Sequence, residues 1–286
     1  MTISVVLASC RPAPLMAAAV SRLLPQFRSI GVELIVARVG DSRPDSDAIL
    51  EGCRLVRCPS GATIPVVRGT GLAAATGDLV LLTEDNCVVR PDWVERLVAG
   101  FTPDADVVGG VMANAQSERS IDAAAGFTEY GFYGPFQKAG AVPALACANV
   151  AYHRRVVADV VSWSLAGQWE AGIHGRLAQQ GVQFRLVTDA VVEQNVQHQV
   201  GTFCRNRYQH GRDYAVLRSS HLGSVKRFVL ACATPLLPAV LTWRVWRRSG
   251  RSAPREFLRA LPFTLTFFGA WSAGEAAGYF RGNGAG

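Results

Sequence analysis

Short apolar runs alternate with longer segments of helical periodicity through the first two thirds of the chain. Strands of four to eight apolar residues are typical of buried β-structure, and helices place apolar residues three and four positions apart. Strands are predicted at residues 3–7, 32–39, 55–57, 79–84, 107–111, 147–152, 184–187 and 190–192. Helices are predicted at 14–27, 67–75, 93–101, from 156, from 169 to 181, and at 201–219. This alternation predicts an α/β fold with a mostly parallel, Rossmann-like central sheet flanked by helices.

One predicted strand ends abruptly in a cluster of oxygen-bearing side chains. The apolar run Leu79–Leu82 is followed by Glu84-Asp85-Asn86. In open α/β sheets, ligands bind at the carboxyl ends of the strands. Two carboxylates and an amide suit a hard cation such as Mg²⁺ or Mn²⁺, which usually takes substrate phosphate oxygens as well. The alternative interpretation is a simple polar turn after a strand.

The last third of the chain combines apolar segments with most of the positive charge. Residues 1–200 carry a net charge of −3, whereas 201–286 hold 13 basic and three acidic residues. Two nearly continuous apolar segments, 228–246 and 261–280, are close to the roughly 20 residues that span a bilayer. The basic flanks favour interfacial or re-entrant helices on the cytoplasmic face of the membrane. A soluble helical cap is the alternative, and nucleic acid is disfavoured because no recognition helix is evident.

Other features of the sequence predict the cell compartment and the division of the chain into domains. Seven cysteines are scattered singly, which favours a reducing compartment. The N-terminus runs directly into a strand pattern, with no sign of a signal peptide. Residues 115–145 are rich in Gly and aromatic residues without a clear period, and we expect a mobile active-site loop there. Residues 1–220 are expected to form a catalytic domain and residues 221–286 a membrane-associated helical region.

Several segments follow one another in a characteristic order over about residues 1–220. They are Ser4–Leu7, Arg68–Asp78, Glu84-Asp85-Asn86 with Pro91-Asp92-Trp93, Ala148–Tyr152, and Trp169-Glu170 with Arg176-Leu177 and Gly181. Taken together, their order and spacing resemble the family-2 glycosyltransferases, which have the GT-A fold. The resemblance implies transfer of a sugar from a nucleotide sugar to a lipid-linked or glycan acceptor, with inversion and with a divalent cation. The apolar C-terminal helices are also common in that family.

The resemblance implies a role for each matching residue. Glu170 is expected to be the catalytic base, and its position beside Trp169 predicts a raised pKa. Glu84, Asp85 and Asn86 are the expected metal ligands. The donor-binding candidates are Ala8, Ser9, Arg11, Asp41, Arg68 and Asp85. The candidates for the acceptor or diphosphate side are Asn149, Trp169, Arg205, Arg207 and Arg212.

Some positions depart from the family pattern. The metal motif is Glu-x-Asn, the second strand ends in Arg38-Val39 without an acidic residue, and Ala171 replaces the second carboxylate of the base motif. The late histidine of the family has only His198 nearby. These departures motivate an alternative, a catalytically degenerate member that acts as a membrane-bound binding or scaffold protein. A sugar nucleotidyltransferase is disfavoured, because no Gly-rich loop follows the first strand.

Overall fold

The strand β1 (Ile3–Ser9) lies in the interior of a mixed sheet, in a computed structural model that describes residues 1–11, 13–40, 52–114, 118–219 and 222–281. The strand order along the sheet is β3-β2-β1-β4-β8-β6-β9-β5, and β7 pairs with β9 beside this path. The remaining strands are β2 (Glu33–Val39), β3 (Arg54–Cys58), β4 (Leu79–Glu84), β5 (Cys87–Val89), β6 (Val107–Asn114), β7 (Gly140–Ala141), β8 (Val150–His153) and β9 (Phe184–Gln194). The expected α/β fold with a central sheet is therefore confirmed.

The parallel pairing runs through β3, β2, β1 and β4, and the pairs β4–β8, β8–β6, β9–β5 and β9–β7 are antiparallel. All of β1 and β4 is buried, as continuous apolar runs predict for strands covered on both faces. In the β1–β4 register, Ala8 lies opposite Glu84. The loop after β1 therefore begins beside the acidic step that follows β4.

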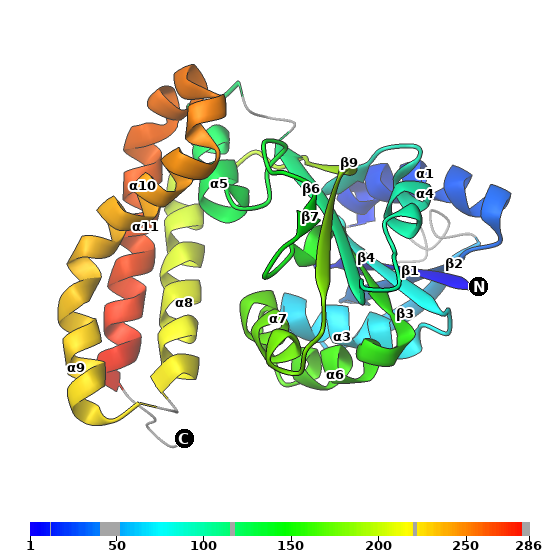
Figure 1. Ribbon diagram of the computed structural model, residues 1–286, viewed down its shortest axis with the longest axis horizontal. Helices are drawn as coiled ribbons and strands as arrows, with labels where there is room; N and C mark the ends of the chain where they lie inside the picture. The colour runs from blue at the N-terminus through cyan, green and yellow to red at the C-terminus, as the bar shows by residue number, and fades with distance from the viewer. Residues whose placement is uncertain (12, 41–51, 115–117, 220–221, 282–286) are drawn as a thin grey trace. The chain divides into compact units, whose positions relative to one another are not determined.

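Helices cover both faces of this sheet (Figure 1). One face carries α3 (Ile64–Ala74), α6 (Arg154–Leu165) and α7 (Glu170–Gln179), and the other carries α1 (Ala13–Ile30) and α4 (Trp93–Ala99). A short 3₁₀ turn, η2 (Cys147–Asn149), leads into β8. Because β8 pairs antiparallel with β4, η2 lies next to the carboxyl end of β4.

Glycines allow α3 to approach its neighbours closely. A Cβ on Gly71 would overlap Val6 Cγ1 and lie 2.9 Å from Ala37 Cβ, on the sheet side of the helix. A Cβ on Gly69 would lie 2.9 Å from Ser164 Cβ of α6. Real Cβ atoms do not tolerate such distances, so α3 is wedged between the sheet and α6 only because these two residues are glycine.

The chain divides into two compact units. The first comprises Met1–Ala113 and Gln137–Asn195, and the second comprises Asn114–Phe136 and Val196–Gly286. The sequence places the boundary at residue 220, whereas in the structure α8 (Val200–Ser219) groups with the helices that follow it. Periodicity marks a helix but does not tell which neighbour covers it, and the packing of α8 decides its unit.

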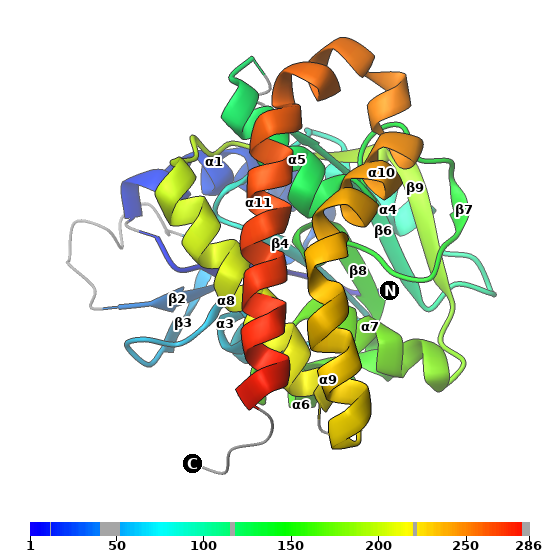
Figure 2. The ribbon, with the colours of Figure 1, turned by 90° about the vertical axis from the view of Figure 1, so that its left-hand side faces the viewer.

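The second unit consists of helices around a long central one, α11 (Pro254–Arg281) (Figure 2). The others are α5 (Ser120–Tyr130), α8, α9 (Ser224–Ala233), α10 (Leu237–Arg248) and the short turns η3 (Thr234–Leu236) and η4 (Gly250–Ser252). Gly274 and Gly278 of α11 face the backbone carbonyls of Tyr208 and Arg212 in α8. Such small residues let the two backbones approach closely.

The helix α5 corrects the expectation of an irregular loop over residues 115–145. Residues 115–117 lie outside the described residues, but 120–130 are helical and Ala123, Ala124 and Phe127 are buried. They pack in one apolar cluster with Phe257 and Phe267 of α11. The small residues that weakened the periodicity are there because the helix packs against a neighbour, which the local sequence does not reveal.

Candidate active site

Asp85 ties the end of β4 to the loop that follows β1. Its backbone N–H donates to Ala8 O at 3.1 Å. Its Oδ2 accepts hydrogen bonds from Ser9 Oγ at 2.8 Å and from the Arg11 backbone N–H at 3.0 Å. Arg11 Nε lies 3.8 Å from Asp85 Oδ1. The structure thus brings four of the predicted donor-binding residues together at the carboxyl ends of two adjacent parallel strands, where such folds bind ligands.

Burial dominates the electrostatics of Asp85. It raises the pKa of the carboxyl above its ordinary value, and the hydrogen bond from Ser9 and the charge of Arg11 offset this effect only in part. Burial, together with Asp85 and Glu84, also raises the pKa of the Cys10 thiol to about 11. Cys10 is therefore protonated at neutral pH, and the charged chemistry of this loop comes from Asp85 and Arg11.

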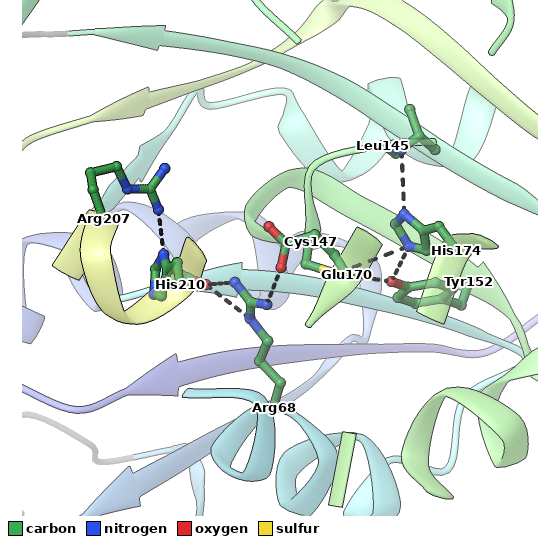
Figure 3. A network of polar contacts seen from close by, with 9 residues as sticks. Arg68, Leu145, Cys147, Tyr152, Glu170, His174, Arg207 and His210 are labelled. Atoms are coloured by element: carbon green, nitrogen blue, oxygen red, sulfur yellow. Dashed lines mark hydrogen bonds and ion pairs between the residues drawn. The ribbon is translucent and has the colours of Figure 1, made fainter. Parts of the chain in front are cut away.

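Arg68 connects the acidic step with the predicted catalytic base (Figure 3). Its Nε donates to Glu84 Oε1 at 2.9 Å, and its Nη2 contacts the same oxygen. Its Nη1 donates to Glu170 Oε2 at 3.0 Å. The guanidinium carbon lies 5.9 Å from the centre of the Trp169 ring. Glu84 and Glu170 therefore face the same cation, although they come from β4 and α7.

The expected raised pKa of Glu170 is wrong. Burial does raise it, but the charge of Arg68 and the hydrogen bonds to the carboxylate outweigh burial, so the pKa lies below its ordinary value. The charges of Glu84 and Glu170 outweigh the burial of Arg68 and hold its pKa well above the usual range. Arg68 and Glu170 are thus both ionised at neutral pH. The sequence shows Trp169 beside Glu170, but it does not show the arginine that reaches it from α3.

A buried polar chain lies behind Glu170, one turn further along α7 (Figure 3). His174 Nδ1 accepts from the Leu145 backbone N–H at 3.3 Å, so Nδ1 carries no proton and the neutral ring has its proton on Nε2. That Nε2 lies 3.0 Å from Tyr152 Oη, which is 3.4 Å from Cys147 Sγ. Burial lowers the pKa of His174 to about 4 and raises that of Cys147 to about 12. This neutral chain connects α7 to η2 and β8.

The sequence motifs assign no role to His174, because the five histidines of the chain lack metal-ligand spacing. A signal was present, since His174 follows Glu170 by four positions and therefore lies on the same face of the helix. The contacts of His174 with Tyr152 and Leu145 depend on tertiary packing and leave no trace in the local sequence.

One of the predicted site residues, Asn149, has other surroundings than expected. Asn149 is fully buried, and its Nδ2 donates to Val111 O and Ala190 O, both at 2.9 Å. Its Oδ1 accepts from Trp93 Nε1 at 2.8 Å. These hydrogen bonds hold η2, β6, β9 and α4 together inside the core and use both N–H groups of the amide. Asp41 lies outside the described residues.

The three arginines predicted for the diphosphate side belong to α8 in the second unit. Arg205 is exposed, and Arg212 lies 3.3 Å from Asp213. Arg207 is buried, lies 3.6 Å from Glu129 and contacts His210, a pair that Figure 3 also draws. Its guanidinium also lies 5.4 Å from the Trp271 ring centre. The Arg207 guanidinium therefore makes these contacts inside the second unit.

The acidic step has the donor chemistry of a hard-cation site that shares its coordination with substrate. Within the described residues, no group of three or more His, Cys, Asp or Glu side chains is arranged to hold a metal. Glu84 and Asp85 each use one carboxylate oxygen for Arg68 or for the β1 loop. The second oxygen of Asp85, Oδ1, lies 3.8 Å from Arg11 Nε. With Asn86, this set fits Mg²⁺ or Mn²⁺ completed by phosphate oxygens.

The fold and the site define a class of α/β protein. In it, the acidic residues that follow the parallel strand β4 lie near a carboxylate, Glu170, at the start of a helix. Residues 4–161 match the glycosyl transferase family 2, and the chain belongs to this family of glycosyltransferases. No match was found among the curated proteins compared by sequence.

Two solved structures resemble the whole chain. The mannosyltransferase PcManGT from Pyrobaculum calidifontis, solved with GDP-Man and Mn²⁺, has a TM-score of 0.58 and 14% identity, and the alignment covers 96% of this chain and 86% of that one. S. aureus TarS 1-349 has a TM-score of 0.52 and 10% identity, with 95% and 91% coverage. At these identities the likeness establishes the GT-A fold.

Proposed function

We propose that this chain transfers a sugar from a nucleotide sugar to a glycan or lipid-linked acceptor by a single, inverting displacement. The observation that carries the proposal is the convergence of two predicted sites. Glu84, the first residue of the acidic step, and the Glu170 carboxylate both contact the Arg68 guanidinium. The complex of PcManGT with GDP-Man and Mn²⁺ supports a nucleotide-sugar donor for a fold of this kind.

In this reaction the chain's own residues position charge and move one proton. The acceptor hydroxyl attacks the anomeric carbon, its proton passes to the Glu170 carboxylate, and the bond from that carbon to the diphosphate breaks. The incoming and leaving oxygens are on opposite sides, so the anomeric configuration inverts. Arg68 donates towards the charge that develops on the leaving diphosphate. Asp85, with Ser9 and Arg11, shapes the donor side of the site.

A divalent cation, when bound, neutralises diphosphate charge and acts as a Lewis acid on its oxygens. Glu84, Asp85 and Asn86 are the residues that would hold it. An amide is a weaker ligand than a carboxylate, and we therefore assign the main contribution to Asp85, whose Oδ2 accepts from Ser9 and whose Oδ1 would bind the cation beside Arg11.

The test is a screen of the purified protein against nucleotide sugars with and without Mn²⁺. Binding to the folded state raises the unfolding temperature, so thermal stabilisation identifies the donor. The donor is then incubated with lipid-linked and glycan acceptors, and product formation and anomeric configuration are measured. Mn²⁺-dependent transfer with inversion supports the proposal. Donor binding without turnover over many acceptors favours the scaffold alternative, and the absence of any donor binding contradicts both.

We also propose that the second unit lies on the cytoplasmic face of the membrane through one face of α9 and α10. Large apolar side chains recur there at helical spacing, with Val225, Phe228 and Trp243 80%, 61% and 55% exposed. Ser224–Arg248 is long and apolar enough to cross a membrane by length and composition, and 22% of its most apolar window is buried.

The charge around this face supports an anionic lipid partner. No acidic residue occurs between Asp213 and Glu256, and the basic residues of this interval include Lys226, Arg227, Arg244, Arg247, Arg248, Arg251 and Arg255. Arg247 stacks on the Trp243 ring at 4.9 Å, which combines an interfacial aromatic with a cation. Pro235 and Pro238 interrupt the segment at η3 and α10, which favours a surface position over a straight span. A lipid-linked acceptor is consistent with such a location.

A further inference from the structure

Arg68 is a buried cation that lies between two carboxylates, unlike an ordinary surface arginine. Its side chain is 8% exposed and carries the positive charge shared by Glu84 and Glu170. All three nitrogens of the guanidinium donate to these two carboxylates. An ion of this kind is costly to bury unless its partners compensate its charge, and here two carboxylates do so.

The backbone that carries Arg68 is held firmly. Gly69 and Gly71 press α3 against α6 and against the sheet, at distances that leave no space for a Cβ. Arg68 therefore lies in a turn of α3 that is in contact with α6 on one side and with the sheet on the other. A change at the site therefore moves the guanidinium through its side-chain torsions, while its Cα stays in place.

Glu84 is shared by Arg68 and by the cation of the proposed function. A divalent ion held by the acidic step would share Glu84 with the guanidinium, and like charges repel strongly where solvent is largely excluded. We propose, on the basis of the proposed function, that Arg68 acts as a counter-ion within the site. It pairs with Glu84 and Glu170 in the free protein and competes with the divalent cation for Glu84. Loading of the cation then releases Nε and Nη2 from Glu84 to the donor diphosphate, while Glu170 retains Nη1.

This role couples metal loading to donor binding. Because the guanidinium and the cation compete for one carboxylate, removal of the positive charge at position 68 strengthens metal binding in the absence of nucleotide. The same change weakens binding of the diphosphate, because it removes its donor group. Coupling between protein sites typically spans about 5- to 150-fold in affinity, and we expect about tenfold in each direction.

The experiment is calorimetric titration of the purified protein with Mn²⁺ alone, and then with GDP and UDP in the presence of Mn²⁺. Arg68→Met removes the charge at similar length, and Arg68→Lys retains it. Arg54→Gln is the matched control, because Arg54 forms an exposed ion pair with Glu33 at 3.2 Å in the same unit. We expect tighter Mn²⁺ binding and weaker nucleotide binding for Arg68→Met, near-normal Mn²⁺ binding for Arg68→Lys, and no change for Arg54→Gln.

A second measurement uses the wild-type site and does not depend on the folding of a buried-charge variant. The Trp169 ring is next to the guanidinium, so its fluorescence should change when Mg²⁺, a diamagnetic cation, displaces Arg68 from Glu84. Trp169→Phe identifies the contribution of this indole among the six tryptophans. An Mg²⁺-dependent change that disappears in Trp169→Phe supports the counter-ion role.

The outcomes separate this inference from the proposed function. Mn²⁺ binding that is unchanged or weaker in Arg68→Met, or no Trp169 response to Mg²⁺, overturns the counter-ion role and leaves the glycosyltransferase proposal intact. A wild type that binds neither Mn²⁺ nor any nucleotide sugar overturns the proposed function, and the counter-ion role with it.

Discussion

Arg68 Nη1 lies 3.0 Å from Glu170 Oε2, and these residues are 102 positions apart in the sequence. The contact connects α3, which is wedged against the sheet, to the first turn of α7. It lowers the pKa of the proposed base and holds it ionised, ready to accept a proton.

Replacement of Glu170 by Gln removes the proton acceptor but keeps the size of the side chain. We expect transfer to fall about 10²- to 10⁴-fold, the usual contribution of a positioned base. Donor affinity should change little, since Glu170 is assigned to the acceptor hydroxyl. Initial rates and calorimetry with the donor found in the screen measure both. Glu95→Gln on the exposed side of α4 is the matched control, and a Glu170→Gln rate near that of the wild type contradicts the assignment.

Asp85→Asn should weaken ligand binding without lowering the stability of the protein. Burial raises the pKa of Asp85, so its ionised form is disfavoured in the folded state relative to the unfolded chain. The amide removes this charge and keeps an oxygen that accepts from Ser9. We therefore expect an equal or higher unfolding temperature together with donor or Mn²⁺ binding about tenfold weaker, since the charged ligand of the cation is lost. If the variant binds both ligands normally, Asp85 is not part of the site. Ser9→Ala, which removes one hydrogen bond to Asp85, should have a smaller effect.

His174 should make stability depend on pH in the mildly acidic range. Its folded pKa of about 4 lies below its ordinary value of 6.5, so between these values the unfolded chain binds more protons. Stability is therefore full above 6.5 and is lost as the pH falls towards 4, by up to about 3 kcal/mol. Urea unfolding at several pH values should show a flatter profile for His174→Phe than for the wild type. Tyr152→Phe retains the imidazole and should retain the steep profile; equal slopes for all three proteins exclude the effect.

Two Gly→Ala changes, one in α3 and one in α7, should have opposite effects on stability. Gly71→Ala forces a methyl group against Val6 and Ala37, and overpacking of this kind costs about 1–3 kcal/mol. Gly175 lies inside α7, and a methyl group added there would meet nothing within 4 Å. Gly175→Ala should therefore stabilise by about 0.5–1 kcal/mol, because alanine has the higher helix propensity. Thermal unfolding of both variants checks the signs. A Gly71→Ala protein as stable as the wild type contradicts the wedged position of α3.

The exposed face of α9 and α10 predicts binding to anionic vesicles. Phe228→Ser with Trp243→Ser should reduce co-sedimentation with phosphatidylserine vesicles, because it removes apolar contact area. Arg247→Gln with Arg248→Gln should reduce it by about 1 kcal/mol per charge, and mainly at low salt. Phe136→Ser, at an exposed phenylalanine outside this face, is the matched control. Equal binding of all variants, or equal binding to neutral vesicles, contradicts the assignment.

Much of the first unit follows from local pattern. Apolar runs located the strands β1, β2 and β4, because a strand covered on both faces needs continuous hydrophobicity. The switch from Leu82 to Glu84-Asp85-Asn86 located the acidic step at a strand end. Gly181, which has a φ of 85° and follows the end of α7 at Gln179, is likewise a local signal.

The sequence by itself therefore determined which residues form the buried strands, where the acidic step lies and which end of a helix carries Glu170. Only the tertiary structure decided that Arg68 pairs with both Glu84 and Glu170, that Asn149 turns into the core and that α5 and α8 join the C-terminal helices. The physical reason is that periodicity reports how much of a segment is covered. Charge pairing and helix packing depend on which distant segment covers it, and that partner is set by the three-dimensional register of the whole sheet and bundle.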